Sequence, residues 1–229
     1  MFEKAIELDP RYAAAYAGLA ATYHEDYKRG WSDNSKFSGE KCIELAKKSI
    51  QLDEQDSFPH LVLSSIYWRF KLNFELAKSQ LDAAIDLNPN YYWAYCYGCW
   101  FSTCSGDLDK SKLLAKEAIR RNPLLPDGCL GTLGIAEYLS GKYENAIATI
   151  CQITNLEPES YACLAASYAQ LGRVEEAKNV AEGCVEHGGE CALSTDDWRK
   201  FWVTHLNLKE QGSVDHLLDG LNKAGLVQH

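Results

Sequence analysis

Small and apolar residues recur along the chain in a pattern that repeats. Segments 74–89, 108–123, 143–158 and 174–189 share one arrangement, in which a small residue is followed four positions later by an apolar or small one and three positions after that by another. Proline ends the first three segments, and it cannot continue a helix because it lacks a backbone N–H. A second helical stretch, such as 161–172, precedes each segment. The pattern therefore predicts successive pairs of helices.

This unit resembles the tetratricopeptide (TPR) repeat, a helix–turn–helix of about 34 residues. The clearest match places residues of the expected size at Tyr161, Leu164, Ala165, Tyr168, Ala177, Ala181 and Cys184. Small residues are needed where the two helices cross, since bulk there would separate their axes. The resemblance predicts an all-α, right-handed α-solenoid of TPR hairpins. The array spans 1–193, with units near 12–54, 58–89, 92–123, 127–157 and 159–187.

Two stretches depart from the regular repeat. Residues 2–10 match a second helix that ends on Pro10 without a first helix before it. A lone repeat helix cannot bury its apolar face, so we expect further repeats or another domain before Met1 in a longer parent protein. The first unit also contains an insertion at 27–37. Its Gly, Ser and Asn residues predict a loop, and Trp31 and Phe37 are expected to fold back on the array.

Residues 194–229 lie beyond the repeat and predict two amphipathic helices. The first has acidic residues in its opening turn and one broad apolar face formed by Trp198, Phe201, Trp202, His205 and Leu208. The second carries a stripe of Val214, Leu217, Leu218 and Leu221. A solenoid needs a cover at its end, so we interpret these helices as a C-terminal cap. Deleting residues from Thr195 onward is expected to lower the melting temperature or cause aggregation.

Composition and charge narrow the functional classes. The net charge of −9 disfavours a nucleic-acid partner, which needs a concentrated basic surface. No apolar run approaches the roughly 18 residues of a membrane helix, and the first residues lack a secretory signal. The nine cysteines are odd in number and lie mostly within helical patterns, which suits a reducing compartment. These features predict a cytoplasmic protein with no membrane partner.

Candidate chemical motifs have plainer interpretations. Cys96, Cys99 and Cys104 are close in sequence, but Cys99 falls at a small-residue packing position and no second metal-binding motif is present. We interpret these cysteines as packing or groove thiols. The six histidines are scattered without metal spacing. No phosphate-binding loop, dinucleotide-binding motif or nucleophile motif is visible. We expect no catalytic residue, no metal site and no cofactor.

The TPR resemblance also implies where a partner would bind. In TPR arrays the first helix of each unit lines a concave surface through fixed positions, which here include Ala21, His24, Glu25 and Val62. The candidate partner-binding groove consists of Ile66, Arg69, Phe70, Trp93, Cys96, Trp100, Ile135 and Tyr138. Trp93 and Trp100 lie seven positions apart and are expected to share one helix face as an aromatic platform. Two interpretations stay open: the platform binds an apolar peptide or helix, or the array's own ends or the insertion at 27–37 cover it.

Several stretches resemble one bacterial family more specifically. These are YAAAYAGLAATY with the following GWSDN, LAKKSIQLDEQDSFPH, AIDLNPNYYWAY and LLDGLNKAGL. They are similar to the C-terminal TPR region of signalling proteins with a class III adenylate or guanylate cyclase domain. The resemblance implies a regulatory module that binds a protein or peptide, or the parent protein's own output domain. The alternatives are the TPR module of a winged-helix transcription regulator, and a small-molecule or peptide sensor that uses the aromatic groove.

Overall fold

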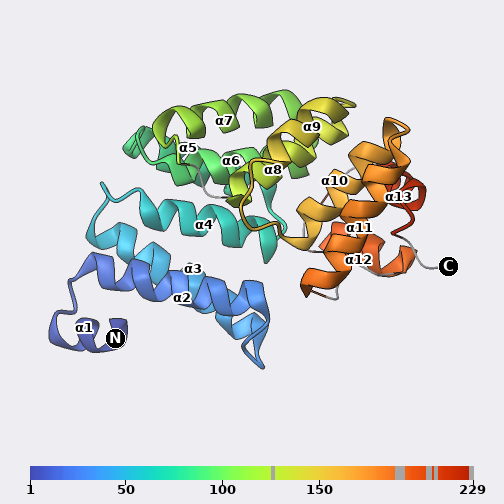
Figure 1. Ribbon diagram of the computed structural model, residues 1–229. Helices are drawn as coiled ribbons and strands as arrows, with labels where there is room; N and C mark the ends of the chain where they lie inside the picture. Colours follow the sequence, from blue (N-terminus) through green and yellow to red (C-terminus); the bar gives the residue numbers. More distant parts are fainter. Residues whose placement is uncertain (125–126, 189–193, 205–207, 209–210, 227–229) are drawn as a thin grey trace. The chain divides into compact units, whose positions relative to one another are not determined.

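The computed structural model describes residues 1–124, 127–188, 194–204, 208 and 211–226. Within these residues all thirteen regular elements are α-helices, which confirms the predicted all-α class (Figure 1). Their bounds are α1 Phe2–Leu8, α2 Ala13–Arg29, α3 Ser35–Leu52, α4 Phe58–Arg69, α5 Phe74–Leu87, α6 Tyr92–Cys104, α7 Leu108–Arg121, α8 Asp127–Leu139, α9 Tyr143–Ile150, α10 Pro158–Gln170, α11 Val174–Gly188, α12 Thr195–Thr204 and α13 Gln211–Lys223.

The helices form two compact units, Met1–Tyr97 and Gly98–His229. The division falls within α6, so the first part of this helix belongs to the first unit and the rest to the second. The boundary that the sequence predicts between array and cap follows residue 193, which lies outside the described residues. Each unit is described by itself below.

Neighbouring helices of the first unit pack at small residues. Helix α2 contacts α1, α3 and α4, and α4 also contacts α3 and α5. Ala20 of α2 and Ala46 of α3 are fully buried, as is Cys42 of α3. Gly39 lets α3 approach Phe70, because a Cβ at this position would lie 2.8 Å from the Phe70 ring. The unit therefore depends on short side chains where its helices meet.

The insertion predicted as a loop at 27–37 is largely helical. Helix α2 continues to Arg29, and Gly30 ends it in the left-handed conformation, with φ of 64°. The side chain of Asn34 then accepts a hydrogen bond from the backbone N–H of Phe37 and caps α3. The extra residues thus lengthen both helices instead of forming a long loop. Only part of the expected folding back occurs, since Phe37 meets the edge of Tyr23 while Trp31 is 69% exposed.

The second unit uses similar packing. Helix α8 contacts α7, α9 and α10, and α10 also contacts α9 and α11. A Cβ on Gly134 of α8 would lie 2.8 Å from Cδ1 of Ile150, so these helices also need a short residue at their contact. Helix α9 ends at Ile150, whereas the second helix of this unit was predicted to end near residue 157. The backbone N–H groups of Thr154 and Asn155 instead donate to the carboxylate of Asp127.

The last two helices pack in different ways. Trp198 and Trp202 of α12 are fully buried and stack with ring centroids 5.7 Å apart. Helix α13 contacts α12, α10 and α8, so it covers the faces of two first helices. Its apolar stripe is buried at Val214, Leu217, Leu218 and Leu221. His205, which the sequence places on the α12 face, lies outside the described residues.

Gly220 is where α13 comes nearest to the rest of its unit. A Cβ there would lie 2.7 Å from Cβ of Ala166 in α10 and would also collide with the Tyr138 hydroxyl. We expect Gly220→Ala to lower the free energy of unfolding by about 1–3 kcal/mol, the usual effect of overpacking. Urea unfolding monitored by circular dichroism measures this change.

Gly212 provides the matched control, because it lies in the same helix and a Cβ there would meet no atom within 4 Å. Gly212→Ala should leave the free energy of unfolding unchanged or slightly higher, since alanine favours the helix more than glycine does. Equal effects of the two substitutions would contradict the close approach of α13.

Candidate functional site

The first unit contains a cavity of about 270 Å³ lined by α2, α4 and the start of α6. Most of its lining is apolar, and four aromatic residues contribute. The lining residues are Ala21, His24, Glu25, Phe58, Leu61, Val62, Ser65, Tyr91, Trp93 and Tyr97. A concave, mostly apolar site with a few convergent polar groups is the usual form of a ligand-binding site.

Helical spacing explains why these residues converge. Ala21, His24 and Glu25 follow one another at intervals of three and one, which places them on one face of α2. Trp93 and Tyr97 are four positions apart, so their side chains share a face of α6. The cavity is therefore formed by one face from each of its three helices.

Trp93 forms an accessible part of the aromatic lining. It is 40% exposed, and its ring stacks on Tyr92 with centroids 5.2 Å apart. Tyr97 is more deeply placed, and burial is the main cause that raises the pKa of its hydroxyl. A partner can thus reach one large indole while the neighbouring phenol stays neutral.

A buried hydrogen bond joins α2 to α4 beside the cavity. Nε2 of His24 lies 2.7 Å from Oγ of Ser65, and these residues are only 5% and 2% exposed. Burial is the largest cause that lowers the pKa of His24, so the imidazole is neutral near pH 7. A neutral imidazole can form a hydrogen bond with the serine hydroxyl without placing a charge in the protein interior. The pair fixes the two cavity walls relative to each other.

Glu25 supplies the negative charge at the cavity. Its pKa is lowered to about 2, chiefly by a hydrogen bond with His24 and also by one with Arg29. Nε of Arg29 donates to Oε2 of Glu25 at 3.0 Å, and Nζ of Lys28 lies 3.6 Å from Oε1. The side chain of Glu25 is 39% exposed, so the carboxylate is ionised, held in position and still accessible.

Ser65, His24 and Glu25 stand in the order of a catalytic triad, which consists of a nucleophile, a base and a carboxylate that orients the base. Nδ1 of His24 lies 3.5 Å from Oε1 of Glu25, which completes the sequence of contacts. Acyl transfer also needs donors aimed at an oxyanion, usually backbone N–H groups. Ser65 lies within α4, where backbone N–H groups bond to carbonyls one turn earlier. The backbone N–H groups around Ser65 are therefore engaged within the helix and are not free to act as oxyanion donors.

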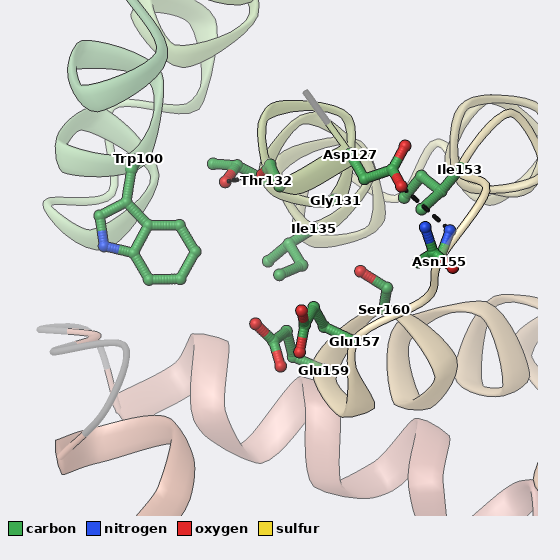
Figure 2. A pocket seen from close by; sticks show the side chains of 11 residues that line it. Trp100, Asp127, Gly131, Thr132, Ile135, Ile153, Asn155, Glu157, Glu159 and Ser160 are labelled. Atoms are coloured by element: carbon green, nitrogen blue, oxygen red, sulfur yellow. Dashed lines mark hydrogen bonds between the residues drawn. The ribbon is translucent and has the colours of Figure 1, made fainter. Parts of the chain in front are cut away.

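The second unit has a much smaller pocket, shown in Figure 2. Trp100 lies across from Ile135, and the side chains of Glu157 and Glu159 lie below Ile135 in this view (Figure 2). Its volume is about 20 Å³, which is room for about one water molecule. No side chain of a partner fits a space of this size. The cavity of the first unit is therefore the candidate site.

The structure distributes the predicted groove residues of the first unit unevenly. Trp93 lines the cavity, whereas Ile66 is fully buried and Cys96 is 6% exposed. Phe70 packs on Gly39 and meets the edge of Tyr27 at a centroid distance of 5.4 Å. The carbonyl of Arg69 accepts a hydrogen bond from the Tyr27 hydroxyl. Apart from Trp93, these residues therefore contribute to helix packing and not to the cavity lining.

In the second unit, Trp100 and Ile135 line the small pocket. Tyr138 was expected in an open groove, but it is fully buried beneath α13. Its hydroxyl donates to the carbonyl of His216 at 2.9 Å, and the two rings stack with centroids 4.8 Å apart. The expectation for Tyr138 is corrected, because the C-terminal helix covers this face. The single platform of Trp93 and Trp100 stays a prediction, since the two residues belong to different units.

Sequence reasoning did not select several residues of the cavity. Phe58, Ser65, Tyr91 and Tyr97 all line it and were not among the predicted site residues. Spacing offered a signal for two of them, because Tyr97 follows Trp93 by four positions and Ser65 follows Phe58 by seven. Tyr91 precedes α6, where helical periodicity carries no information about side-chain direction.

Other chemical features of the described residues agree with packing roles. Cys96, Cys99 and Cys104 are buried, and burial raises the pKa of the Cys99 thiol above its ordinary value. Among the described residues, no three His, Cys, Asp or Glu side chains come close enough together to hold a metal ion. None of the described helices combines the length and apolar character needed to cross a membrane.

Comparison with known proteins identifies the fold. Residues 1–36 match the family model described as tetratricopeptide repeat. A chain of the APC/C hetero-tetramer Cut9-Hcn1 is similar over 97% of this chain and 42% of its own length, with a TM-score of 0.68 and 13% identity. The chain has the TPR fold. PilF of Pseudomonas aeruginosa is similar over 89% of this chain and 92% of its own, with a TM-score of 0.63 and 12% identity.

A third TPR structure is YrrB, described as a TPR protein with an unusual peptide-binding site. It matches 80% of this chain and 91% of its own, with a TM-score of 0.56 and 17% identity. Identities this low establish the fold alone. No curated protein matches the sequence. The chain spans less than half of the Cut9-Hcn1 chain that it resembles, and most of the length of PilF and YrrB.

The buried His24 predicts a pH dependence of stability. Its pKa is lowered in the folded protein, so the unfolded chain binds a proton more readily. The free energy of unfolding should be greatest above the ordinary histidine pKa of about 6.5 and should fall as the pH drops below it. Denaturant titrations at about pH 8 and about pH 5.5 measure this loss while staying above the ordinary range of glutamate.

His24→Gln serves as the comparison, because glutamine can bond Ser65 without titrating. The variant should lose less stability than the wild type between the two pH values. It should keep some pH dependence, since burial also lowers the pKa of His216. An identical pH dependence in both proteins would contradict a neutral, buried His24.

Proposed function

We propose that this chain is a protein-interaction module that binds a peptide segment of its partner in the cavity of the first unit. The observation that carries the proposal is the cavity of about 270 Å³ with an accessible indole, Trp93, in its lining. Tryptophan and tyrosine are the residues that most often dominate binding energy at interfaces. The TPR fold supports the same conclusion, and one protein of that fold is described as having a peptide-binding site.

The size of the cavity suits a side chain. A protein cavity of about 150 Å³ can hold benzene, whereas this one measures about 270 Å³. A single aromatic side chain with part of its backbone therefore fits, while a globular domain would contact only the rim. This favours recognition of an extended or helical peptide through one anchor residue.

The preorganised lining favours affinity. The His24–Ser65 hydrogen bond fixes two of the three helices that bear the cavity. Tyr97 is held by its burial and by a hydrogen bond with Ser65. Side chains that are already ordered lose little conformational freedom when a partner binds, so more of the contact energy remains as affinity.

We propose further that the module regulates a larger cytoplasmic signalling protein of the nucleotide-cyclase type. The support is the resemblance of the stretches at 12–34 and 45–60 to the TPR regions of such proteins. The nine cysteines, which are odd in number and lie mostly within helical patterns, support a reducing compartment. A co-purified output domain with cyclase activity would support this parent, whereas a winged-helix domain in the same polypeptide would favour a transcription regulator.

Trp93→Ala tests the binding function. Peptides selected from a displayed library for binding to the full chain provide the ligands, and calorimetry measures their dissociation constants. Loss of a hot-spot tryptophan costs about 2 kcal/mol or more, so we expect affinity to fall about 30-fold. The melting temperature should change little, because Trp93 is 40% exposed.

Two other tryptophans provide controls. Trp31 is 69% exposed and does not line the cavity, so Trp31→Ala should retain full affinity. Trp68 is 1% exposed, and Trp68→Ala should instead cost about 3–5 kcal/mol of folding stability. Equal affinity of the wild type and Trp93→Ala would rule out the cavity as the binding site.

A further inference from the structure

The cavity of the first unit contains one feature that an apolar anchor would not use. Glu25 is part of the lining, together with four aromatic residues, Phe58, Tyr91, Trp93 and Tyr97. An ionised group beside an apolar cavity is costly unless it is paired or hydrogen-bonded. Its presence restricts the chemistry of the side chain that can enter.

An acidic side chain is unsuited to this cavity. A ligand carboxylate would approach the ionised Glu25, and like charges at short range repel each other. The faces of aromatic rings also carry partial negative charge. Both effects disfavour an anion in the cavity.

A cationic side chain is disfavoured for a different reason. Glu25 already has two cationic partners on its own helix, since Arg29 lies 3.0 Å and Lys28 3.6 Å from its oxygens. A cationic ligand would be attracted by the carboxylate of Glu25 but repelled by the positive charges of Lys28 and Arg29. The local charge therefore favours a neutral ligand.

Glu25 can still accept a hydrogen bond from a neutral donor. A carboxylate offers about four acceptor positions, and the hydrogen bonds with His24 and Arg29 occupy two of them. A phenol O–H or an indole N–H brings a donor without a charge. Hydrogen bonds to charged acceptors are stronger than those between neutral groups.

We propose that this cavity selects a tyrosine or tryptophan side chain of a peptide partner, with the aromatic ring among the four aromatic residues and its O–H or N–H donated to Glu25. This inference rests on the proposed peptide-binding function and specifies the anchor residue. Phenylalanine of similar size fits the cavity but leaves the carboxylate without this donor.

Small molecules that reproduce the side chains test the selection directly. The probes are p-cresol and 3-methylindole for tyrosine and tryptophan, toluene for phenylalanine and n-butylamine for lysine. Ligand-observed NMR with the full chain gives their dissociation constants. We expect p-cresol and 3-methylindole to bind about tenfold more tightly than toluene, the difference that one hydrogen bond to a charged group makes. Butylamine should bind more weakly than all three.

Glu25→Gln is the decisive variant, because it keeps the shape of the side chain and removes its charge. The preference for p-cresol over toluene should fall to about threefold or less, with the affinity for toluene unchanged. Glu44→Gln is the matched control, since Glu44 is an exposed, lysine-paired glutamate on α3 that does not line the cavity. This control should keep the full preference.

The outcomes distinguish a failure of the selection by Glu25 from a failure of the proposed binding function of the cavity. If toluene and p-cresol bind equally to the wild type, or if Glu25→Gln keeps the preference, the selection by Glu25 is wrong while the cavity remains a binding site. If butylamine binds most tightly, the cavity recognises a cation and this inference is overturned. If no probe binds, the proposed function itself fails. Should Glu25→Gln melt at a lower temperature, the wild-type comparison of the four probes still decides.

Discussion

The close approach of paired helices is the constraint on which the remaining structure depends. In the first unit, Ala20, Cys42 and Ala46 are fully buried where α2 and α3 pack together. In the second, Gly134 meets Ile150 at a distance that leaves no room for a Cβ. Short residues let the backbones come close enough for dispersion contacts along the whole helix pair. Because these contacts fix each helix about its own axis, they also decide which side chains face the cavity.

The two units use the faces of their first helices differently. In the second unit α13 lies on α8 and α10, so that Tyr138 is buried and bonded to His216. In the first unit the corresponding faces of α2 and α4 border a cavity, with Trp93 of α6 in its lining. The sequence left open whether the groove is accessible or covered by the chain itself. In the second unit, the chain itself covers the face that bears Tyr138.

The sequence was most informative where the repeat is regular. The all-α class and the TPR fold followed from the recurrence of small residues, because their spacing reflects the helix crossings directly. The insertion at 27–37 was misjudged, since its Gly and Asn residues act as a helix stop and a helix cap within a short connection. Helix α9 was predicted too long, since the backbone N–H groups of Thr154 and Asn155 donate to the carboxylate of Asp127, a contact distant in sequence.

The candidate site was harder to predict than the fold. Trp93 and Ile66 were assigned to one partner-binding groove, but Trp93 lines the cavity whereas Ile66 is buried. Periodicity gives the face of a helix, but the depth of each residue depends on neighbouring helices. The pairing of His24 with Ser65 joins residues 41 positions apart, and no local pattern reveals such a contact. The role of Glu25 likewise became visible only with its charged neighbours in place.

The central claim is that the cavity of the first unit receives the partner, and the six tryptophans make it directly measurable. Each indole N–H gives a separate signal in a two-dimensional ¹H–¹⁵N NMR spectrum. During titration with a selected peptide, the account predicts that the Trp93 signal shifts with a saturable dependence on peptide concentration. The signals of Trp31, Trp198 and Trp202 should remain in place. Shifts confined to these three tryptophans, with Trp93 unchanged at saturation, would contradict the account.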